Sequence, residues 1–148
     1  FLTVMTGCRP IDRPASQSNG AVVQQGAQTP LPGGTFNKLF PKAQGDYALV
    51  YTQEKTGFAE AKLNYKGDEV ATFAISDTAN NASAADKYKN PDKQISGYPA
   101  VAVGSSGTAI LVANRFQVQI RSKQDTFTAS DRETWLTKFD LAGLAALK

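Results

Sequence analysis

Residues 59–76 read AEAKLNYKGDEVATFAIS, and this stretch decides the class of fold. From position 59 to 65, apolar and polar side chains alternate with a period of two, which is typical of an antiparallel strand with one buried face. A second strand pattern covers Glu69–Ser76, where the odd-numbered positions from 71 onward are apolar. Lys66-Gly67-Asp68 between the two runs is typical of a tight turn. The stretch therefore predicts a β-hairpin with one face in the core.

Similar patterns extend outward from this hairpin in both directions. Further strands are predicted at Tyr47–Thr52, Tyr98–Val103, Thr108–Ala113 and Phe116–Ser122. Short helical segments are predicted at Phe36–Phe40, Thr78–Tyr88, Ser130–Phe139 and Asp140–Leu147. These segments predict an α+β fold, an antiparallel sheet of about six strands with two to three short helices packed on one face.

Helix starts are predicted from capping residues. Asn80 or Asn81 is the expected N-cap of the segment that follows the hairpin. Ser130-Asp131-Arg132-Glu133 has the capping-box pattern, in which Ser130 and Glu133 satisfy each other's backbone donors. We therefore expect the helix that carries Trp135 to begin at Ser130.

The predicted elements occur in the same order in both halves of the domain, as two strand-strand-strand-helix units. Tyr47 corresponds to Tyr98, and Gly57 corresponds to Gly107 at nearly the same offset. Two interpretations stay open, a degenerate duplication of a βββα unit and a chance agreement of short elements.

Composition excludes several functional classes. Sixteen Lys and Arg stand against thirteen Asp and Glu, a formal charge of +3, and the signs alternate along the chain, so no nucleic-acid footprint is expected. The chain has no His and one Cys, which excludes an intrachain disulfide and a zinc site of thiolates and imidazoles. We therefore expect no metal, no cofactor and no enzyme activity. An enzyme built here would depend on carboxylates, Lys, Tyr or Ser.

The first eight residues, Phe-Leu-Thr-Val-Met-Thr-Gly-Cys, carry a second signal. They resemble the end of a bacterial lipoprotein signal peptide, with small residues at Thr6 and Gly7 before Cys8, although Met5 stands where that family usually has Leu. The resemblance implies that residues 1–7 are removed and that the thiol of Cys8 receives diacylglycerol. Two or three acyl chains give stable attachment to a membrane. A buried Cys in an N-terminal apolar strand is the alternative reading of the same residues.

Residues 8–34 differ in composition from the rest of the chain. Four of the seven prolines and four of the twelve glycines fall between positions 9 and 34. A segment of this kind buries too little apolar surface to offset its chain entropy. The sequence thus predicts a lipidated Cys8 with a flexible tether over residues 8–34, followed by a single α+β domain over residues 35–148.

Three groups of polar residues were candidates for ligand binding. Asp77, Asn80 and Asn81 could bind a cation or a sugar hydroxyl, but turn and cap chemistry explains them better. Gly104-Ser105-Ser106-Gly107 joins two predicted strands and lacks the Lys of a phosphate-binding loop, so a hairpin is predicted there. Three arginines could share an anionic partner, although scattered surface charge explains them equally well. They are Arg115, Arg121 and Arg132.

The sequence therefore favours a membrane-anchored envelope lipoprotein whose domain is a non-catalytic binding or assembly module. Its expected location is the bacterial cell envelope, with the domain facing the periplasm or the cell exterior. Expected partners are the membrane, through the lipid anchor, and an envelope protein complex or cell-wall polymer. The alternative is an envelope enzyme that uses carboxylates or Lys on an unidentified substrate.

Overall fold

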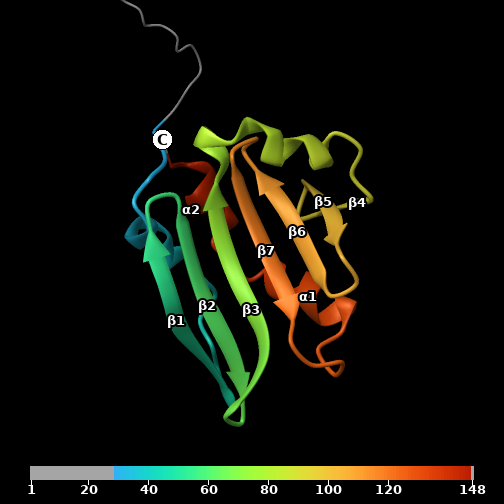
Figure 1. The fold of residues 1–148 in the computed structure, drawn as a ribbon. Coiled ribbons are helices and arrows are strands. Elements are labelled where there is room, and N and C mark those ends of the chain that lie inside the picture. The colour runs from blue at the N-terminus through green and yellow to red at the C-terminus, as the bar shows by residue number, and fades with distance from the viewer. Residues whose placement is uncertain (1–28, 148) are drawn as a thin grey trace, which may run out of the picture.

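The computed structural model describes residues 29–147, and the predicted lipidation site Cys8 lies outside them. Seven strands form one sheet in the order β1-β2-β3-β7-β6-β5-β4, with every neighbouring pair antiparallel (Figure 1). The strands are β1 (Tyr47–Lys55), β2 (Phe58–Tyr65), β3 (Asp68–Asp77), β4 (Lys93–Ile95), β5 (Tyr98–Val103), β6 (Gly107–Val112) and β7 (Phe116–Ser122). The 3₁₀ helices are η1 (Gly33–Leu39), η2 (Thr78–Asn80) and η3 (Ala82–Tyr88), and the α-helices are α1 (Ala129–Leu136) and α2 (Leu141–Ala145).

The predicted α+β class is confirmed, but the sheet has seven strands rather than about six. The additional strand is β4, three residues at the edge of the sheet that pair with β5 through a turn at Ser96-Gly97. Only Ile95 of this strand is buried. Three residues with one buried side chain show no alternation, and for this reason the sequence pattern did not reveal β4.

The hairpin predicted from residues 59–76 is confirmed as β2 and β3. Ala61 lies opposite Phe73, and both are fully buried. Lys66 and Gly67 both have positive φ, 51° and 90°. Left-handed backbone at both central positions is the two-residue turn whose twist matches that of paired strands.

Apolar side chains from one face of the sheet form the main core with η1, α1 and α2. The inward-facing side chains of β3 and β7 are almost completely buried. Phe73 of β3 contacts both Trp135 and Phe139, at ring-centroid distances of 5.6 and 5.4 Å. Phe36 of η1 packs edge-on against Phe116, with centroids 5.9 Å apart. The aromatic residues thus link both ends of the domain across this face.

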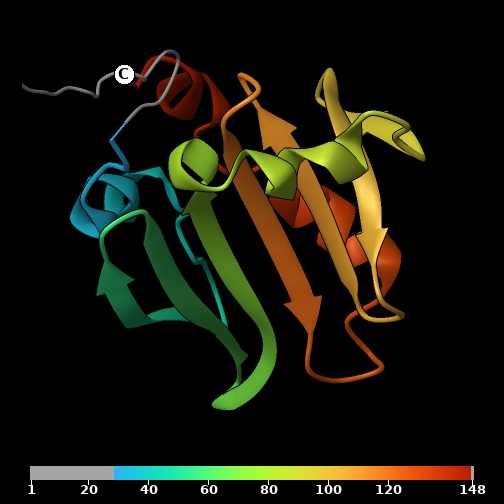
Figure 2. The same cartoon turned by 45° about the horizontal axis from the view of Figure 1, so that its top comes forward.

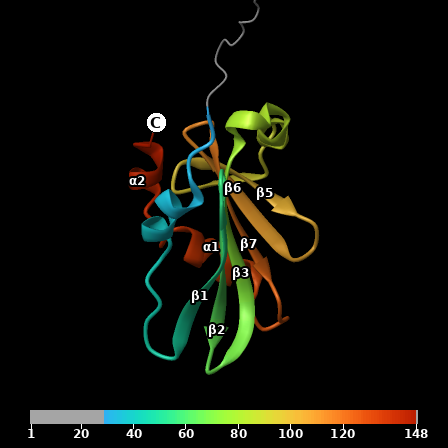
Figure 3. The same cartoon turned by 60° about the vertical axis from the view of Figure 1, so that its left-hand side comes forward.

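The prediction that all helices pack on one face is wrong. In Figures 2 and 3, η2 and η3 lie on the opposite side of the sheet from α1 and α2. A second core cluster forms there, in which Tyr88 of η3 packs with Val101 of β5 and Leu111 of β6. Every residue of β6 is buried, because helices cover both of its faces. The sequence of β6 is apolar at nearly every position, as expected of a strand buried on both faces.

The strand order bears on the question of an internal duplication. The meanders β1-β2-β3 and β5-β6-β7 are arranged symmetrically about the β3–β7 pair. A two-fold axis normal to the sheet would place the helix after β3 and the helix after β7 on the same face. Because η3 and α1 cover opposite faces, the helices do not follow the symmetry of the strands.

Candidate functional site

Asp77 and Arg115 form an ion pair where β3 ends and β7 begins. Arg115 Nε donates to Asp77 Oδ1 and Nη2 donates to Oδ2, each at 2.8 Å. Asp77 also accepts the backbone N–H groups of Ala79 at 3.0 Å and Leu31 at 2.9 Å. The Asp77 side chain is fully buried and that of Arg115 is 10% exposed. We call this pair and its backbone partners the clasp.

The clasp explains the residues that the sequence offered as a cation or sugar site. Both carboxylate oxygens of Asp77 accept hydrogen bonds from other parts of the domain, and Asp77 is the N-cap of η2. The sequence favours such a capping role over ligand binding for this group of residues. Burial alone would raise the pKa of the Asp77 carboxyl, but hydrogen bonds from Arg115, Leu31 and Ala79 and the charge of Arg115 hold it below its ordinary value. The Asn81 side chain is exposed and accepts a hydrogen bond from Ser83 Oγ at 2.7 Å. Asp77 is therefore kept ionised by an arginine, a poor state for a general acid.

The clasp also holds the chain that enters the domain. Arg115 Nη2 donates to the carbonyl oxygen of Thr29 at 3.0 Å, and Gly57 N donates to that of Leu31 at 2.6 Å. Contacts with the sheet therefore begin before residue 35, where composition placed the start of the domain. In Figure 1 the entering chain (blue) reaches the domain at the end of the sheet where β3 terminates.

The three arginines do not share a surface. Arg115 belongs to the clasp, and Arg132 is buried beneath α1, where it donates to the hydroxyls of Thr108 and Ser122. Arg121 is exposed on the other face of β7. The pKa of Lys87 is lowered mainly by the partial burial of Lys87, and secondly by the positive charge of Arg121. A common anionic partner for the three is excluded by this arrangement.

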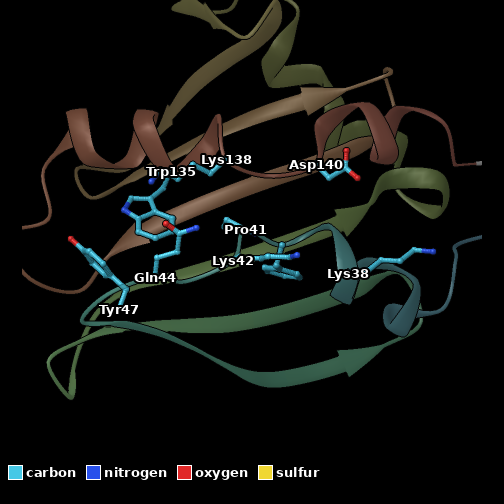
Figure 4. A pocket seen from close by; sticks show the side chains of 9 residues that line it. Lys38, Pro41, Lys42, Gln44, Tyr47, Trp135, Lys138 and Asp140 are labelled. Atoms are coloured by element: carbon cyan, nitrogen blue, oxygen red, sulfur yellow. The ribbon is translucent and has the colours of Figure 1, made fainter.

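A groove of about 830 Å³ lies between the η1–β1 connection on one side and α1 with the α1–α2 connection on the other. Its lining residues are Lys38, Phe40, Pro41, Lys42, Gln44, Tyr47, Trp135, Lys138 and Asp140. Figure 4 shows Tyr47 and Trp135 toward one end of this groove and Lys38 and Asp140 toward the other. We call it the lysine groove.

Cationic and aromatic groups dominate the lysine groove. Lys38, Lys42 and Lys138 are exposed, and within residues 29–147 none of them takes part in an ion pair. Lys138 Nζ lies 4.7 Å from the centroid of the Trp135 ring, whose other side contacts Tyr47 at 5.1 Å between centroids. The indole is 6% exposed, so it forms a wall of the groove and does not project into it.

The single acid of the groove, Asp140, has a structural role. Its side chain caps α2 by accepting the N–H of Gly143 at 2.9 Å. The groove therefore presents three positive charges against one carboxylate that is already hydrogen-bonded. An arrangement of this kind attracts anionic groups, and the half-buried Tyr47 is the part of the aromatic wall that a ligand can contact.

Sequence reasoning missed the lysine groove because its residues come from separate segments. The sequence predicts the helix that carries Trp135, but the alternating charges along the chain do not bring the three lysines together. One signal is available in the sequence: Lys38 and Lys42 flank Leu39-Phe40-Pro41, so an apolar segment that is expected to be buried carries a positive charge on either side.

No cluster of three or more potential metal ligands occurs within residues 29–147. None of the helices in this part of the chain has the length and apolar character needed to span a bilayer. Comparison of the chain with protein-family models, curated protein sequences and solved structures finds no match.

Proposed function

We propose that the chain is a lipid-anchored protein of the bacterial envelope whose domain is a non-catalytic binding module, and that the lysine groove binds an anionic cell-wall polymer. The observation that carries the binding role is the groove itself, with three exposed lysines beside an aromatic wall. Within the described residues these lysines are not used in ion pairs of the fold. No acid within residues 29–147 competes with a ligand for their charge.

The kind of cation in the groove favours a polymer over a small, tightly held anion. A lysine ammonium is a flexible point charge, whereas close bidentate recognition of one carboxylate or phosphate is the role of arginine. The groove is also open to solvent, and its volume of about 830 Å³ is within the range of known ligand sites. Several weak charge contacts along an open channel suit a ligand with repeated anionic groups, and the sum of such contacts supplies the affinity.

The anchor follows from the resemblance of residues 1–8 to a lipoprotein signal peptide. Lipidation of Cys8 would attach the chain to a membrane, and the residues up to 28 would link it to the clasp. A polymer-binding domain joined in this way would connect the membrane to the cell wall.

The location is tested in a bacterial host with an intact lipoprotein-processing system, by expressing the chain behind the charged and apolar regions of a complete lipoprotein signal peptide. The intact mass of membrane-extracted protein should equal residues 8–148 plus acyl groups, and Cys8→Ala should move the protein to the soluble fraction. Wild-type protein that is soluble and has no acyl mass would contradict the anchor and leave the binding role to be tested separately.

The binding role is tested with purified protein and two polymers, a polyanion such as a teichoic acid and a neutral glucan. We expect saturable binding of the polyanion alone, weakened at least tenfold by the triple change Lys38→Gln, Lys42→Gln and Lys138→Gln. The matched control is Lys62→Gln, Lys66→Gln and Lys89→Gln, which removes the same charge from other exposed positions. Equal weakening in both triple variants would show that net charge, and not the groove, is responsible. Anionic lipid vesicles form a third arm, and preference for them over the polymer would reassign the groove to the membrane surface.

A further inference from the structure

Arg132 of α1 is a buried cation that forms no ion pair with an acid within residues 29–147. The residue is 8% exposed and lies between α1 and the sheet. Its Nε donates to Thr108 Oγ1 at 2.9 Å and its Nη1 donates to Ser122 Oγ at 2.7 Å. These are its hydrogen bonds within residues 29–147, and they use two of the five N–H groups of a guanidinium. A buried charge is costly unless an opposite charge or further hydrogen bonds compensate it.

Three acids that neighbour Arg132 in the sequence or line a pocket with it are engaged elsewhere. Asp131 accepts hydrogen bonds from the backbone N–H and the hydroxyl of Thr128 in the cap of α1. Glu133 pairs with Lys93 of β4. Asp92 accepts the backbone N–H of Ala102 at 3.0 Å. None of these three carboxylates forms an ion pair with the guanidinium.

A cavity of about 340 Å³ adjoins the Arg132 side chain at the start of α1. The hydroxyl groups of Ser105 and Ser106 on the β5–β6 turn line it. Ser122 at the end of β7 also lines it, but its hydroxyl donates to the Phe127 carbonyl oxygen at 2.6 Å and accepts from Arg132. Lys123 adds a second positive charge, and Ala129 places the first turn of α1 at the cavity. The one acid in the lining is Asp125, which is exposed.

We propose that this cavity is a binding site for a phosphate group, either free or as a phosphomonoester, with Arg132 as its principal ligand. A guanidinium binds phosphate oxygens through two parallel N–H groups, and Arg132 retains unassigned donors. Serine hydroxyls and the positive end of a helix are further ligands that phosphate accepts in proteins. The turn Gly104–Gly107 is the hairpin that the sequence predicts, and its serines would contribute hydroxyls without the geometry of a phosphate loop. This site shares no lining residue with the lysine groove, so it does not depend on the proposed function.

The proposal is tested on the full chain by titration with inorganic phosphate, glycerol phosphate and, as a tetrahedral anion of other chemistry, sulfate. Binding should be saturable and should raise the melting temperature, because a ligand that binds only the native state stabilises it. Preference for glycerol phosphate would identify an ester as the ligand, and preference for inorganic phosphate would identify the free ion. Failure of all three to bind saturably at millimolar concentration would overturn the proposal.

Variants locate the site. Arg132→Gln should lower the affinity at least tenfold, and Lys123→Gln and the pair Ser105→Ala, Ser106→Ala should each lower it severalfold. The exposed positions of Lys123 and Ser105 keep the test usable if Arg132→Gln does not fold. Lys66→Gln, at the exposed turn between β2 and β3 and in the lining of neither site, is the matched control and should leave phosphate affinity unchanged. If Lys138→Gln abolished phosphate binding while Lys123→Gln did not, the anion would belong to the groove and the Arg132 site would be rejected.

Discussion

Arg115 and Asp77 are 38 residues apart in the chain, yet two nitrogens of one side chain bind two oxygens of the other, each at 2.8 Å. The β3–β7 pairing makes this possible, since Asp77 lies opposite Phe116 in the ladder and Arg115 immediately precedes it. Arg115 also lies over the Phe116 ring, 4.9 Å from the centroid. The ion pair therefore joins the two meanders of the sheet and the entering chain at a single point.

Removal of one partner of this pair should be strongly destabilising. Arg115→Leu leaves the Asp77 carboxylate buried without its cation, and we expect a loss of about 3–5 kcal/mol in the free energy of unfolding. Lys62→Gln is the control, because the Lys62–Glu69 pair is exposed and should contribute less than about 1 kcal/mol. Urea denaturation measures both. Equal small losses would mean that the clasp does not stabilise the domain.

The lowered pKa of Asp77 makes stability depend on pH on the acid side. In the unfolded chain this carboxyl takes up its proton near pH 4, while in the folded protein it does so at lower pH. The unfolded state thus binds more protons as pH falls, so the contribution is present above the unfolded pKa and is lost as pH falls through the folded pKa. Asp77→Asn should flatten the unfolding free energy below about pH 4 relative to wild type. If the unfolding free energy fell equally steeply with pH in both proteins, Asp77 would not be the source of the acid sensitivity.

How far the sequence predicts the fold is illustrated by β2 and β4. The alternation in β2 reflects a strand that is buried on one face and solvated on the other, so Ala59, Ala61 and Leu63 were placed correctly. β4 is too short to show a period and depends on β5 for its backbone hydrogen bonds. The side of the sheet that η3 covers was predicted wrongly, because apolar residues on both faces of β6 do not indicate which element covers which face.

The candidate sites were less accessible to sequence reasoning, since each arises from contacts between distant segments. In the sequence, Arg132 resembles any surface arginine, because its burial results only from the packing of α1 on β6 and β7. The lysine groove requires the η1–β1 connection to lie beside α1. Asp77 was recognised as a residue of interest from its position at a strand end, but its partner Arg115 could not be identified without the register of β3 and β7.

The N-cap of α1 in the structure differs from the one that the sequence predicts. The predicted capping box of Ser130 and Glu133 is wrong, because Thr128 is the N-cap and exchanges hydrogen bonds with Asp131. The buried Phe127 directly before Thr128 fixes where the helix begins. We therefore expect Thr128→Ala to cost about 1 kcal/mol. Ser130→Ala should change the free energy of unfolding by less than about 0.5 kcal/mol. A larger loss from Ser130→Ala than from Thr128→Ala would mean that Ser130 is the N-cap after all.

Gly33 should tolerate no side chain. A Cβ at this position would lie within 3.0 Å of backbone atoms of Lys55 and Phe58, which cannot move without breaking the β1–β2 hairpin. We expect Gly33→Ala to cost about 1–3 kcal/mol through overpacking. Gly34→Ala is the control, because its Cβ would meet only the flexible side chain of Glu54. Thermal denaturation of the two variants checks this, and a Gly33→Ala protein as stable as Gly34→Ala would contradict the close approach of η1 to the hairpin.

Salt should weaken polymer binding at the lysine groove. Exposed charges are screened over about 8–10 Å at physiological ionic strength and over about 3 Å at 1 M, so attraction between lysines and a polyanion falls as salt is added. Trp135 is the only tryptophan of the chain and lines the groove, so its fluorescence reports binding directly. We expect a steep loss of affinity with salt in the wild type and a shallow one in the variant that lacks Lys38, Lys42 and Lys138. Affinity that does not change between low and high salt would mean that the aromatic wall, and not the lysine charge, holds the ligand.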